Sequence, residues 1–265
     1  NAGRPIPLAI RNPLGLIEQK EDVSDVNRFI GNARVTYNTH FLDGLKAVVN
    51  VGTDMVNSNG TVLIPHTAAS NFQNGGFQTQ YDMEKSNQLI ESFLNYSNAE
   101  QAGNHRLDLT AGYSFQEWST MSPSYPGLNI AGDTLNAPGI PTDTKNALLS
   151  YYGRGIYSYL DKYVVTATLR RDGSSRFSPE NRWGWFPSAS AAWIISEESF
   201  LKDSDLISYL KFRVGYGITG QQDIFYDYPY IPNYQQGSIT AQYQFGGNYV
   251  STLRPDGYDY NIKWE

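Results

Sequence analysis

Residues 163–220 read YVVTATLRRDGSSRFSPENRWGWFPSASAAWIISEESFLKDSDLISYLKFRVGYGITG and contain three alternating segments. Every second residue is apolar within 163–169 and again within 212–218, while 188–195 shows the same alternation with a weaker contrast. Side chains on a strand point alternately to opposite faces. The stretch therefore predicts three strands, each with one apolar face and one polar or slender face.

The composition of the whole chain favours an all-β fold. Only 17% of the 265 residues are charged, while the chain contains 24 Gly, 13 Pro and 20 Tyr. Such a chain is rich in turns and aromatic side chains, which suits strands better than helices or disorder.

Charge and cysteine content exclude several kinds of site. A net charge of -6 without a basic run argues against a nucleic-acid-binding surface. The absence of Cys excludes disulfides and thiolate metal sites. The sequence also lacks a signal-like start and a run of about 18 apolar residues, so a place in a membrane would require a closed barrel, in which every backbone group is paired.

Further alternating segments flank the opening stretch. The sequence predicts a first hairpin from residues 33–41 and 45–55, followed by strands at 81–96, 105–117 and 147–159, a strand at 12–19 and a solvated loop at 21–25. Residues 261–265 are expected to begin another strand, so that about eight to nine strands lie within residues 1–265.

Short and long connections alternate along the chain. The predicted turns 42–44, 97–104 and 160–162 are short, whereas 56–80, 118–146 and 221–260 are long. Short turns at one rim and long loops at the other are typical of outer-membrane barrels. Because a ninth strand begins at the end of the sequence, we expect the middle of a wider barrel rather than a closed eight-stranded one.

Several ordered motifs resemble the SusC/RagA group of TonB-dependent outer-membrane transporters of Bacteroidetes. These motifs are NPLGLIEQ (12–19), LNYSN (94–98), LTAGYSFQ (109–116), LRRDGSSRF (169–177), NRWGWFPSASAAW (181–193), SEESF (196–200), LKFRVGYGITGQQ (210–222) and IKWE (262–265). The resemblance covers nearly the whole chain.

The resemblance implies a transmembrane antiparallel barrel of about 22 strands in the outer membrane of a Gram-negative bacterium. It implies active import of oligosaccharides, peptides or other large nutrients, with a SusD-like surface lipoprotein as partner and energy from the TonB–ExbB–ExbD complex. The plug, the TonB box and the final strands are expected to lie outside these residues. A cofactor and an enzymatic activity are not expected.

Catalytic and metal-binding signals are weak. His40, His66 and His105 lack ligand-like spacing. Ser174 has no nucleophile-elbow pattern around it and no nearby His in sequence. The adjacent acids Glu197 and Glu198 are expected to be solvated turn residues rather than a glycosidase pair.

The remaining polar and aromatic clusters are assigned by position. A group of charges at one rim is expected to pair across strands: Arg170, Arg171, Asp172, Arg176 and Arg182. A second group is expected to form the aromatic girdle on the lipid face: Tyr163, Trp183, Trp185 and Phe186. Four tyrosines of the last long loop are the candidate contacts to substrate or partner lid: Tyr226, Tyr228, Tyr230 and Tyr234.

Two other classes of function stay open at this point. A soluble or surface β-sheet module that binds carbohydrate without transport would stay in solution without detergent. An enzyme embedded in a barrel would need a converging acid, base or nucleophile set, which the sequence does not supply.

Overall fold

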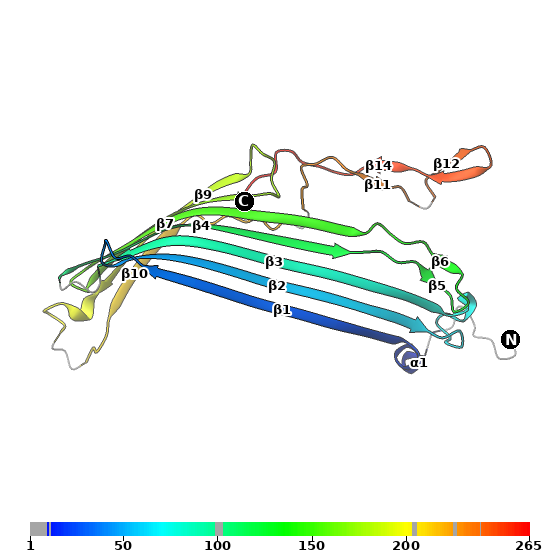
Figure 1. Cartoon of the computed structure of the whole chain (residues 1–265), viewed down its shortest axis with the longest axis horizontal. Helices are drawn as coiled ribbons and strands as arrows, with labels where there is room; N and C mark the ends of the chain where they lie inside the picture. The colour runs from blue at the N-terminus through cyan, green and yellow to red at the C-terminus, as the bar shows by residue number, and fades with distance from the viewer. Residues whose placement is uncertain (1–9, 11, 99–102, 203–205, 225–226, 239) are drawn as a thin grey trace. The chain divides into compact units, whose positions relative to one another are not determined.

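The computed structural model describes residues 10, 12–98, 103–202, 206–224, 227–238 and 240–265. Within them the main sheet is an antiparallel meander in the order β1-β2-β3-β4-β7-β8-β9-β10, and the short strand β5 pairs with β3 on one side and with the short strand β6 on the other (Figure 1). The bounds are β1 Glu21–Asn38, β2 Leu45–Ile64, β3 Phe77–Ser97, β4 His105–Ser122, β5 Gly127–Leu128, β6 Thr134–Asn136, β7 Thr142–Tyr159, β8 Tyr163–Ser174, β9 Trp183–Ile194 and β10 Lys211–Gly217.

Helical structure is limited to short pieces. They are the α-helix α1 Pro13–Glu18 and the 3-10 turns η1 Phe72–Asn74 and η2 Ile195–Glu197. In the described part of the chain, no helix has the length and apolar character needed to cross a membrane.

The chain forms two compact units. Unit 1 comprises Asn1–Asn32, Gly52–Gln88 and Glu117–Lys145. Unit 2 comprises Ala33–Val51, Leu89–Gln116 and Asn146–Glu265.

The N-terminal helix α1 corrects the prediction of a strand at residues 12–19. The Asn12 side chain accepts a hydrogen bond from the Leu14 amide at 3.1 Å, and Pro13 occupies the first helical position. Asn as N-cap and Pro at the first position both favour the start of a helix. These capping signals outweigh the short apolar run.

The long strands correct two predicted loops. Residues 21–25 open β1, and β2 continues to Ile64 through a stretch rich in Asn, Ser and Gly. Strand β2 has 20 residues, although about 10 suffice to cross a bilayer at a tilt. Hydrogen bonds to neighbouring strands stabilise the polar extension, which alternation of apolar residues cannot reveal.

Two hairpin turns agree with the sequence. Leu160 and Asp161 have φ values of 54° and 58°, and the Lys162 amide donates to the Tyr159 carbonyl at 3.0 Å. Positive φ at both central residues is what a two-residue hairpin with right-handed strand twist requires. In the first hairpin, Gly44 has φ 84° and lies so close to the Ser97 carbonyl that a β-carbon would collide with it.

The last long loop contains two small ribbons, where the sequence predicts irregular structure. Strand β11 (Tyr234–Gln236) pairs with β14 (Leu253–Pro255), and β12 (Gln242–Phe245) pairs with β13 (Asn248–Ser251). The second ribbon turns at Gly246 and Gly247, a two-residue glycine turn typical of hairpins.

The end of the chain lies beside the residues that follow β10. The Gln221 amide donates to the Glu265 carbonyl at 2.8 Å, and the Glu265 amide faces the Gln221 carbonyl at 3.5 Å. A reciprocal pair of this kind is the first step of an antiparallel ladder. Residues 261–265 are nevertheless not in a strand, so the expected start of a strand there is not found.

Very little apolar surface is buried inside the chain. Among the described residues, the buried apolar side chains are Val48, Ala68 and Phe177. Many large apolar side chains are exposed instead, for example Val165 at 50% and Val214 at 58%. A soluble domain of this length would bury a larger core.

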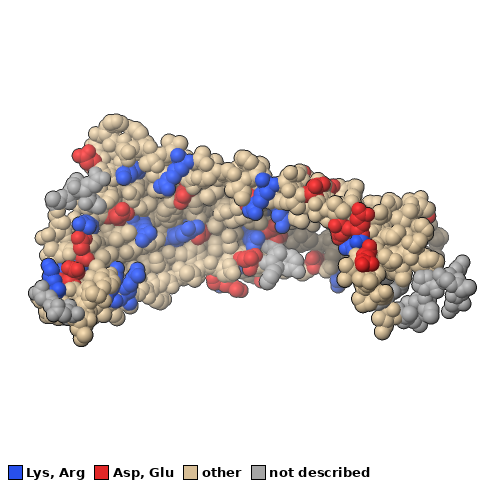
Figure 2. Space-filling model, turned by 90° about the horizontal axis from the view of Figure 1, so that it is seen from below, with Lys and Arg blue, Asp and Glu red and all other residues tan. Residues whose placement is uncertain are grey.

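Charged side chains of both signs lie interspersed on the face shown in Figure 2. That face therefore lacks the one-sided positive field that a nucleic-acid-binding surface presents.

Candidate functional site

A row of aromatic side chains crosses four strands near the turn between β7 and β8. In the register of the sheet, Tyr159 faces Tyr163, Tyr163 faces Trp193 and Trp193 faces Phe212. The Tyr163 ring stacks on Tyr159 and on Trp193, each with centroids 6.4 Å apart. Directly paired residues share a face of a sheet, so this row lies on one face of β7–β10.

A second row lies on the same face eight residues further along β8. There Tyr151 faces Arg171, and Arg171 faces Trp185. Tyr151 also stacks on Trp183, with centroids 6.2 Å apart. Eight residues correspond to about 27 Å along a strand, or about 20 Å along the normal of a membrane for a strand tilted by about 40°.

The band between the two rows carries no charged residue. It consists of Gly153, Gly155 and Tyr157 on β7, Val165, Ala167 and Leu169 on β8, Pro187, Ala189 and Ala191 on β9, and Val214 and Tyr216 on β10. We call the surface formed by this band and the two rows the apolar face. An uncharged band flanked by aromatic rows is the pattern of a lipid-facing barrel surface.

The opposite face is polar. Thr166, Thr168 and Arg170 alternate with the apolar band along β8. Phe186 lies on this polar face, where it is paired with Arg170. The prediction that Phe186 belongs to the girdle is therefore wrong, because it alternates with Trp183 and Trp185, which lie on the apolar face.

The predicted charge cluster is divided between the two faces and the loop. On the polar face, Arg170 Nε donates to the Asp172 carboxylate at 2.7 Å, and Arg170 Nη2 donates to Ser150 Oγ at 2.9 Å. Arg171 points to the apolar face. The Arg170–Asp172 ion pair lies within β8, so the predicted pairing of charges across strands is wrong for Arg170, and only its hydrogen bond to Ser150 crosses to β7. Arg176 binds acids from a distant loop.

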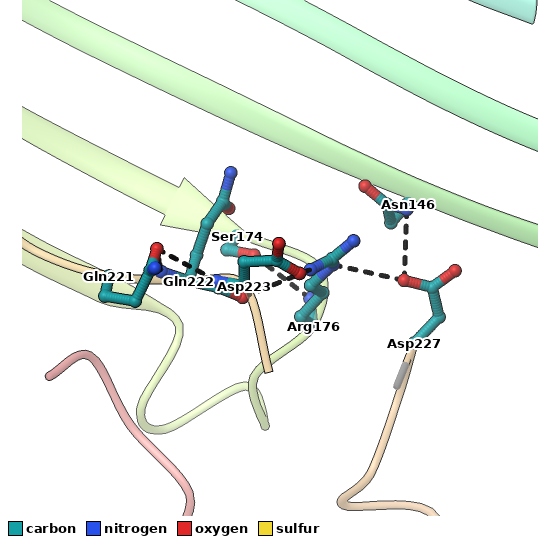
Figure 3. A network of polar contacts seen from close by, with 7 residues as sticks. All are labelled: Asn146, Ser174, Arg176, Gln221, Gln222, Asp223 and Asp227. Carbon is teal, nitrogen blue, oxygen red and sulfur yellow. Dashed lines mark hydrogen bonds and ion pairs between the residues drawn. The ribbon is translucent and has the colours of Figure 1, made fainter. Parts of the chain in front are cut away.

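Arg176 is the centre of a polar network at the end of β8 (Figure 3). Its Nη1 donates to Asp223 Oδ1 at 2.8 Å and to the Gln222 carbonyl at 3.3 Å, and its Nε lies 3.1 Å from Asp227 Oδ1. Asn146, on β7, donates to the same Asp227 oxygen at 3.0 Å. The Asp227 side chain is 12% exposed and that of Asp223 is 74% exposed, so the ion pair with Asp227 is the better shielded of the two.

Hydrogen bonds also anchor the loop between β8 and β9. The Ser175 hydroxyl accepts from the Ala147 amide at 2.9 Å, and the buried Ser174 hydroxyl accepts from the Arg176 amide at 3.2 Å. Both serines serve the backbone in this arrangement.

An aromatic cluster lies beside this loop. The fully buried ring of Phe177 packs on Trp264 with centroids 5.2 Å apart, and Phe186 meets Trp264 edge-on at 5.1 Å. The Trp264 indole donates to the Arg182 carbonyl at 2.9 Å. The cluster ties the last described residues of the chain to β9.

Two of the four candidate tyrosines lie together. The rings of Tyr228 and Tyr230 meet edge-on at 6.2 Å and line a cavity of about 250 Å³. The cavity is also lined by Ala147, Leu149, Gly173, Ser175, Arg182 and Trp183. Its size is below that of pockets that enclose a whole ligand, so it suits one ring or side chain of a larger molecule.

The other two tyrosines are placed differently. Tyr234 lies on β11 and is 70% exposed. Tyr226 lies outside the described residues. The structure thus joins Tyr228 and Tyr230 at one cavity without Tyr234.

Sequence patterns did not indicate the residues that hold this loop in place. Asn146, Asp227 and Trp264 are isolated polar or aromatic positions in sequence, separated by 81 residues in the case of the Asn146–Asp227 bond. Only the fold brings them together.

A larger cavity of about 560 Å³ lies within unit 1. Apolar side chains of Phe29, Met55 and Met121 line it together with Asn27, Asn57, Glu84, Ser86, Ser119 and Asp143. Its mixed lining does not contain a triad of catalytic type.

Glu198, in the turn after η2, binds the aromatic row near the β7–β8 turn. It accepts hydrogen bonds from Tyr163 Oη at 2.6 Å, Trp193 Nε1 at 3.0 Å and Lys162 Nζ at 3.4 Å. The bonds from Tyr163 and Trp193, with the nearby Lys162 charge, lower the pKa of the Glu198 carboxyl. The Glu198 side chain is only 16% exposed, so the prediction that it is a solvated turn residue is wrong. Glu198 binds the aromatic row rather than forming half of a carboxylate pair.

Two of the three histidines also bind neighbouring tyrosines. His40 Nδ1 lies 3.0 Å from Tyr37 Oη, and His105 Nδ1 lies 2.6 Å from Tyr157 Oη. In the residues that the structure describes, no group of three His, Asp or Glu side chains is arranged to hold a metal ion.

Comparison with curated proteins identifies relatives along nearly the whole chain. The chain is 37% identical over 270 residues to the TonB-dependent receptor SusC of Bacteroides thetaiotaomicron, covering 98% of this chain and 26% of that receptor. It is 32% identical to the TonB-dependent receptor P3 of Formosa agariphila, covering 97% of this chain and 26% of that receptor. The chain thus spans about a quarter of the length of these relatives. No established family profile matches it.

Solved structures show the same fold at low sequence identity. The structure of the RagAB peptide transporter matches with a TM-score of 0.81 and 18% identity, over 98% of this chain and 29% of that one. The RagAB peptide importer in its 'closed-closed' state matches with a TM-score of 0.78 and 18% identity, over 93% of this chain and 27% of that one.

Proposed function

Because this chain is a segment of the β-barrel of a SusC-type TonB-dependent receptor, we propose that it forms part of the wall of an active nutrient importer in a bacterial outer membrane. The predicted resemblance and fold class are confirmed by these relatives. They are receptors and importers rather than enzymes, which agrees with the prediction that the chain is not an enzyme.

The apolar face is the observation that carries the proposal. Its two aromatic rows, through Tyr163 and through Tyr151, enclose an uncharged band on the outside of β7–β10. Lipid would cover this band, and the polar face with Thr166 and Arg170 would face the interior of the barrel. Without lipid, the aliphatic side chains of the apolar face would be exposed to water, which is unfavourable for an apolar surface of this size.

The lengths of the connections support an orientation. The two-residue turn at Leu160 and Asp161 would lie at the periplasmic rim, and the loop of residues 175–182 at the extracellular rim. The Arg176 network and the cavity of Tyr228 and Tyr230 would then lie on the outer side, where substrate arrives.

The whole importer would be a single barrel domain of about 22 strands around a plug. A SusD-like lipoprotein would cover it from outside, and the TonB–ExbB–ExbD complex would act through regions beyond this segment. The substrate would be an oligosaccharide or a peptide. The structural similarity to the RagAB peptide transporter supports the peptide within this range.

Tyr228 and Tyr230 would contact the substrate or the lipoprotein, with Tyr226 and Tyr234 as further contacts from the same loop. Tyrosine offers a rigid, amphipathic surface suited to sugar rings and peptide side chains. The position of Tyr228 and Tyr230 around one cavity supports this assignment.

Uptake by the full-length receptor in its host tests the proposal. We expect accumulation of a labelled oligosaccharide or peptide mixture that is lost when TonB is deleted. Replacing both Tyr228 and Tyr230 with Ala should weaken binding of the transported ligand about tenfold. Tyr249→Ala, on β13 and 66% exposed, is the matched control and should bind as the wild type does.

The alternative, a soluble carbohydrate-binding module, makes a different prediction. It would remain in the supernatant without detergent and would run at one position on gels regardless of heating. Partition with the outer membrane and heat-modifiable mobility would exclude it.

A further inference from the structure

Arg171 is the single charged residue on the apolar face of β8–β10. The described positions of this face on the three strands are Tyr163, Val165, Ala167, Leu169, Arg171 and Gly173, then Trp183, Trp185, Pro187, Ala189, Ala191 and Trp193, then Phe212, Val214 and Tyr216. A lone cation in such a surface is costly unless it has an anionic partner or lies at the membrane interface.

Two indole rings hold the guanidinium in place. The Arg171 Cζ atom lies 4.6 Å from the ring centroid of Trp183 and 5.2 Å from that of Trp185. Both distances are within the range of a cation–π interaction. Stacking on the indole rings restricts the orientation of the planar guanidinium but leaves the N–H groups at its edge able to donate hydrogen bonds.

These donors have no partner within the described part of the chain. Arg171 makes no hydrogen bond or ion pair with any described residue, and its Nε is buried without an acceptor. Its neighbour Arg170 differs, because it binds Asp172 and Ser150 on the polar face. Of these two adjacent arginines on β8, Arg170 thus has hydrogen-bond acceptors within the described part of the chain, whereas Arg171 has none.

We propose that Arg171, held between Trp183 and Trp185, binds the phosphate group of a lipid headgroup in the outer leaflet. The inference rests on the proposed function, which places this aromatic row at the extracellular interface of the membrane. Aromatic belts lie at the level of the headgroups. A guanidinium recognises phosphate through two parallel hydrogen bonds, so a phosphate monoester matches the open edge of Arg171 in charge and geometry.

The surroundings favour an anion over other ligands. No Asp or Glu occupies the apolar face of β8, β9 or β10, so no carboxylate competes for the guanidinium. Trp183 and Trp185 are 36% and 56% exposed, which leaves room for acyl chains beside the headgroup.

Reconstituted full-length receptor tests the site. Vesicles contain equal amounts of phosphatidic acid and phosphatidylcholine with identical acyl chains, and native mass spectrometry counts the lipids retained on the protein. We expect the wild type to retain phosphatidic acid over phosphatidylcholine about fivefold, and Arg171→Gln to lose most of this preference. Arg171→Lys, which keeps the charge but not the planar fork, should retain an intermediate preference.

Arg154→Gln is the matched control. Arg154 is an exposed arginine on β7 that faces Thr168 on the polar side, and its replacement should leave the preference unchanged. Heat-modifiable mobility of each variant confirms that the barrel has folded.

Several outcomes would overturn the inference. An unchanged preference in Arg171→Gln, or an equal loss in Arg154→Gln, would contradict a site at Arg171. Retention of inorganic phosphate by the wild type but not by Arg171→Gln, together with no preference for phosphatidic acid in vesicles, would assign the site to free phosphate instead of lipid. Failure of the wild type to enter vesicles would overturn the proposed function as well, whereas entry without a lipid preference overturns this inference alone.

Discussion

Tyr163 and Trp193 face each other across β8 and β9, and both donate a hydrogen bond to the same Glu198 oxygen, at 2.6 and 3.0 Å. Their rings are nearly parallel, with an interplanar angle of 13°. One carboxylate thus binds the polar tips of two aromatic side chains whose rings belong to the apolar face. The arrangement fixes the level of the aromatic row relative to the turn that carries Glu198.

The bonds to Glu198 predict a dependence of stability on pH. Because folding lowers the pKa of Glu198 below its ordinary value of 4.5, the carboxylate stabilises the folded state above that pH. This contribution should decline as the pH falls below about 4.5 and vanish below the lowered pKa. Denaturant unfolding of the full-length receptor in detergent, between pH 7 and pH 3, measures the effect.

Glu198→Gln supplies the comparison for that series. The variant should be less stable than the wild type at pH 7, and the difference should shrink as the pH falls. Glu197→Gln, which removes the neighbouring acid, is the control. A difference between Glu198→Gln and wild type that stays constant down to pH 3 would contradict the account.

The ion pair between Arg176 and Asp227 predicts energetic coupling. Breaking this shielded pair should lower the free energy of opening of the loop around residues 220–224 by about 1–3 kcal/mol. Hydrogen exchange of that loop measures it, in a double-mutant cycle of Arg176→Ala and Asp227→Ala.

Asp223 offers the matched control for this cycle. Its side chain is 74% exposed, so its coupling to Arg176 should be below about 0.5 kcal/mol. Equal coupling energies for Asp223 and Asp227 would contradict the assignment of Asp227 as the anchoring partner.

Tight packing around Phe186 predicts an effect of adding one methyl group. A β-carbon at Gly184 would lie 2.6 Å from Phe186 Cζ, and one at Gly220 would collide with the same ring. Gly184→Ala and Gly220→Ala should each destabilise the folded receptor by about 1–3 kcal/mol in denaturant unfolding. At Gly153 a β-carbon would meet no atom within 4 Å, so Gly153→Ala should be tolerated.

Alternation in sequence predicted the strands where one face is apolar. The segments at 163–169 and 212–218, and the hairpin turn before Tyr163, follow from local pattern alone. The prediction for Phe186 was wrong because it rested on residue type alone. Phe186 is adjacent to Trp185 on β9, and adjacent residues of a strand lie on opposite faces.

The sequence pattern did not predict where the strands end or which distant residues contact one another. The polar half of β2 has no apolar face, so its sequence pattern predicts a loop. Hydrogen bonds to the neighbouring strands, which the pattern does not reveal, hold it in the sheet. The Arg176 network joins residues from β7, the β8–β9 loop and the loop after β10, and no local motif links them. The RDGSSRF motif indicated the family, but not that Arg170 and Arg171 serve opposite faces.

A pair of arginine substitutions on β8 determines whether lipid covers the apolar face of β7–β10. Ala167 and Thr166 are adjacent on β8, at mid-height of the band and on opposite faces. Outer-membrane folding of full-length receptor carrying Ala167→Arg or Thr166→Arg is measured by heat-modifiable mobility and urea unfolding. We expect Ala167→Arg to lose about 2–4 kcal/mol and Thr166→Arg to stay close to wild type. Equal losses, or a larger loss for Thr166→Arg, would contradict the account.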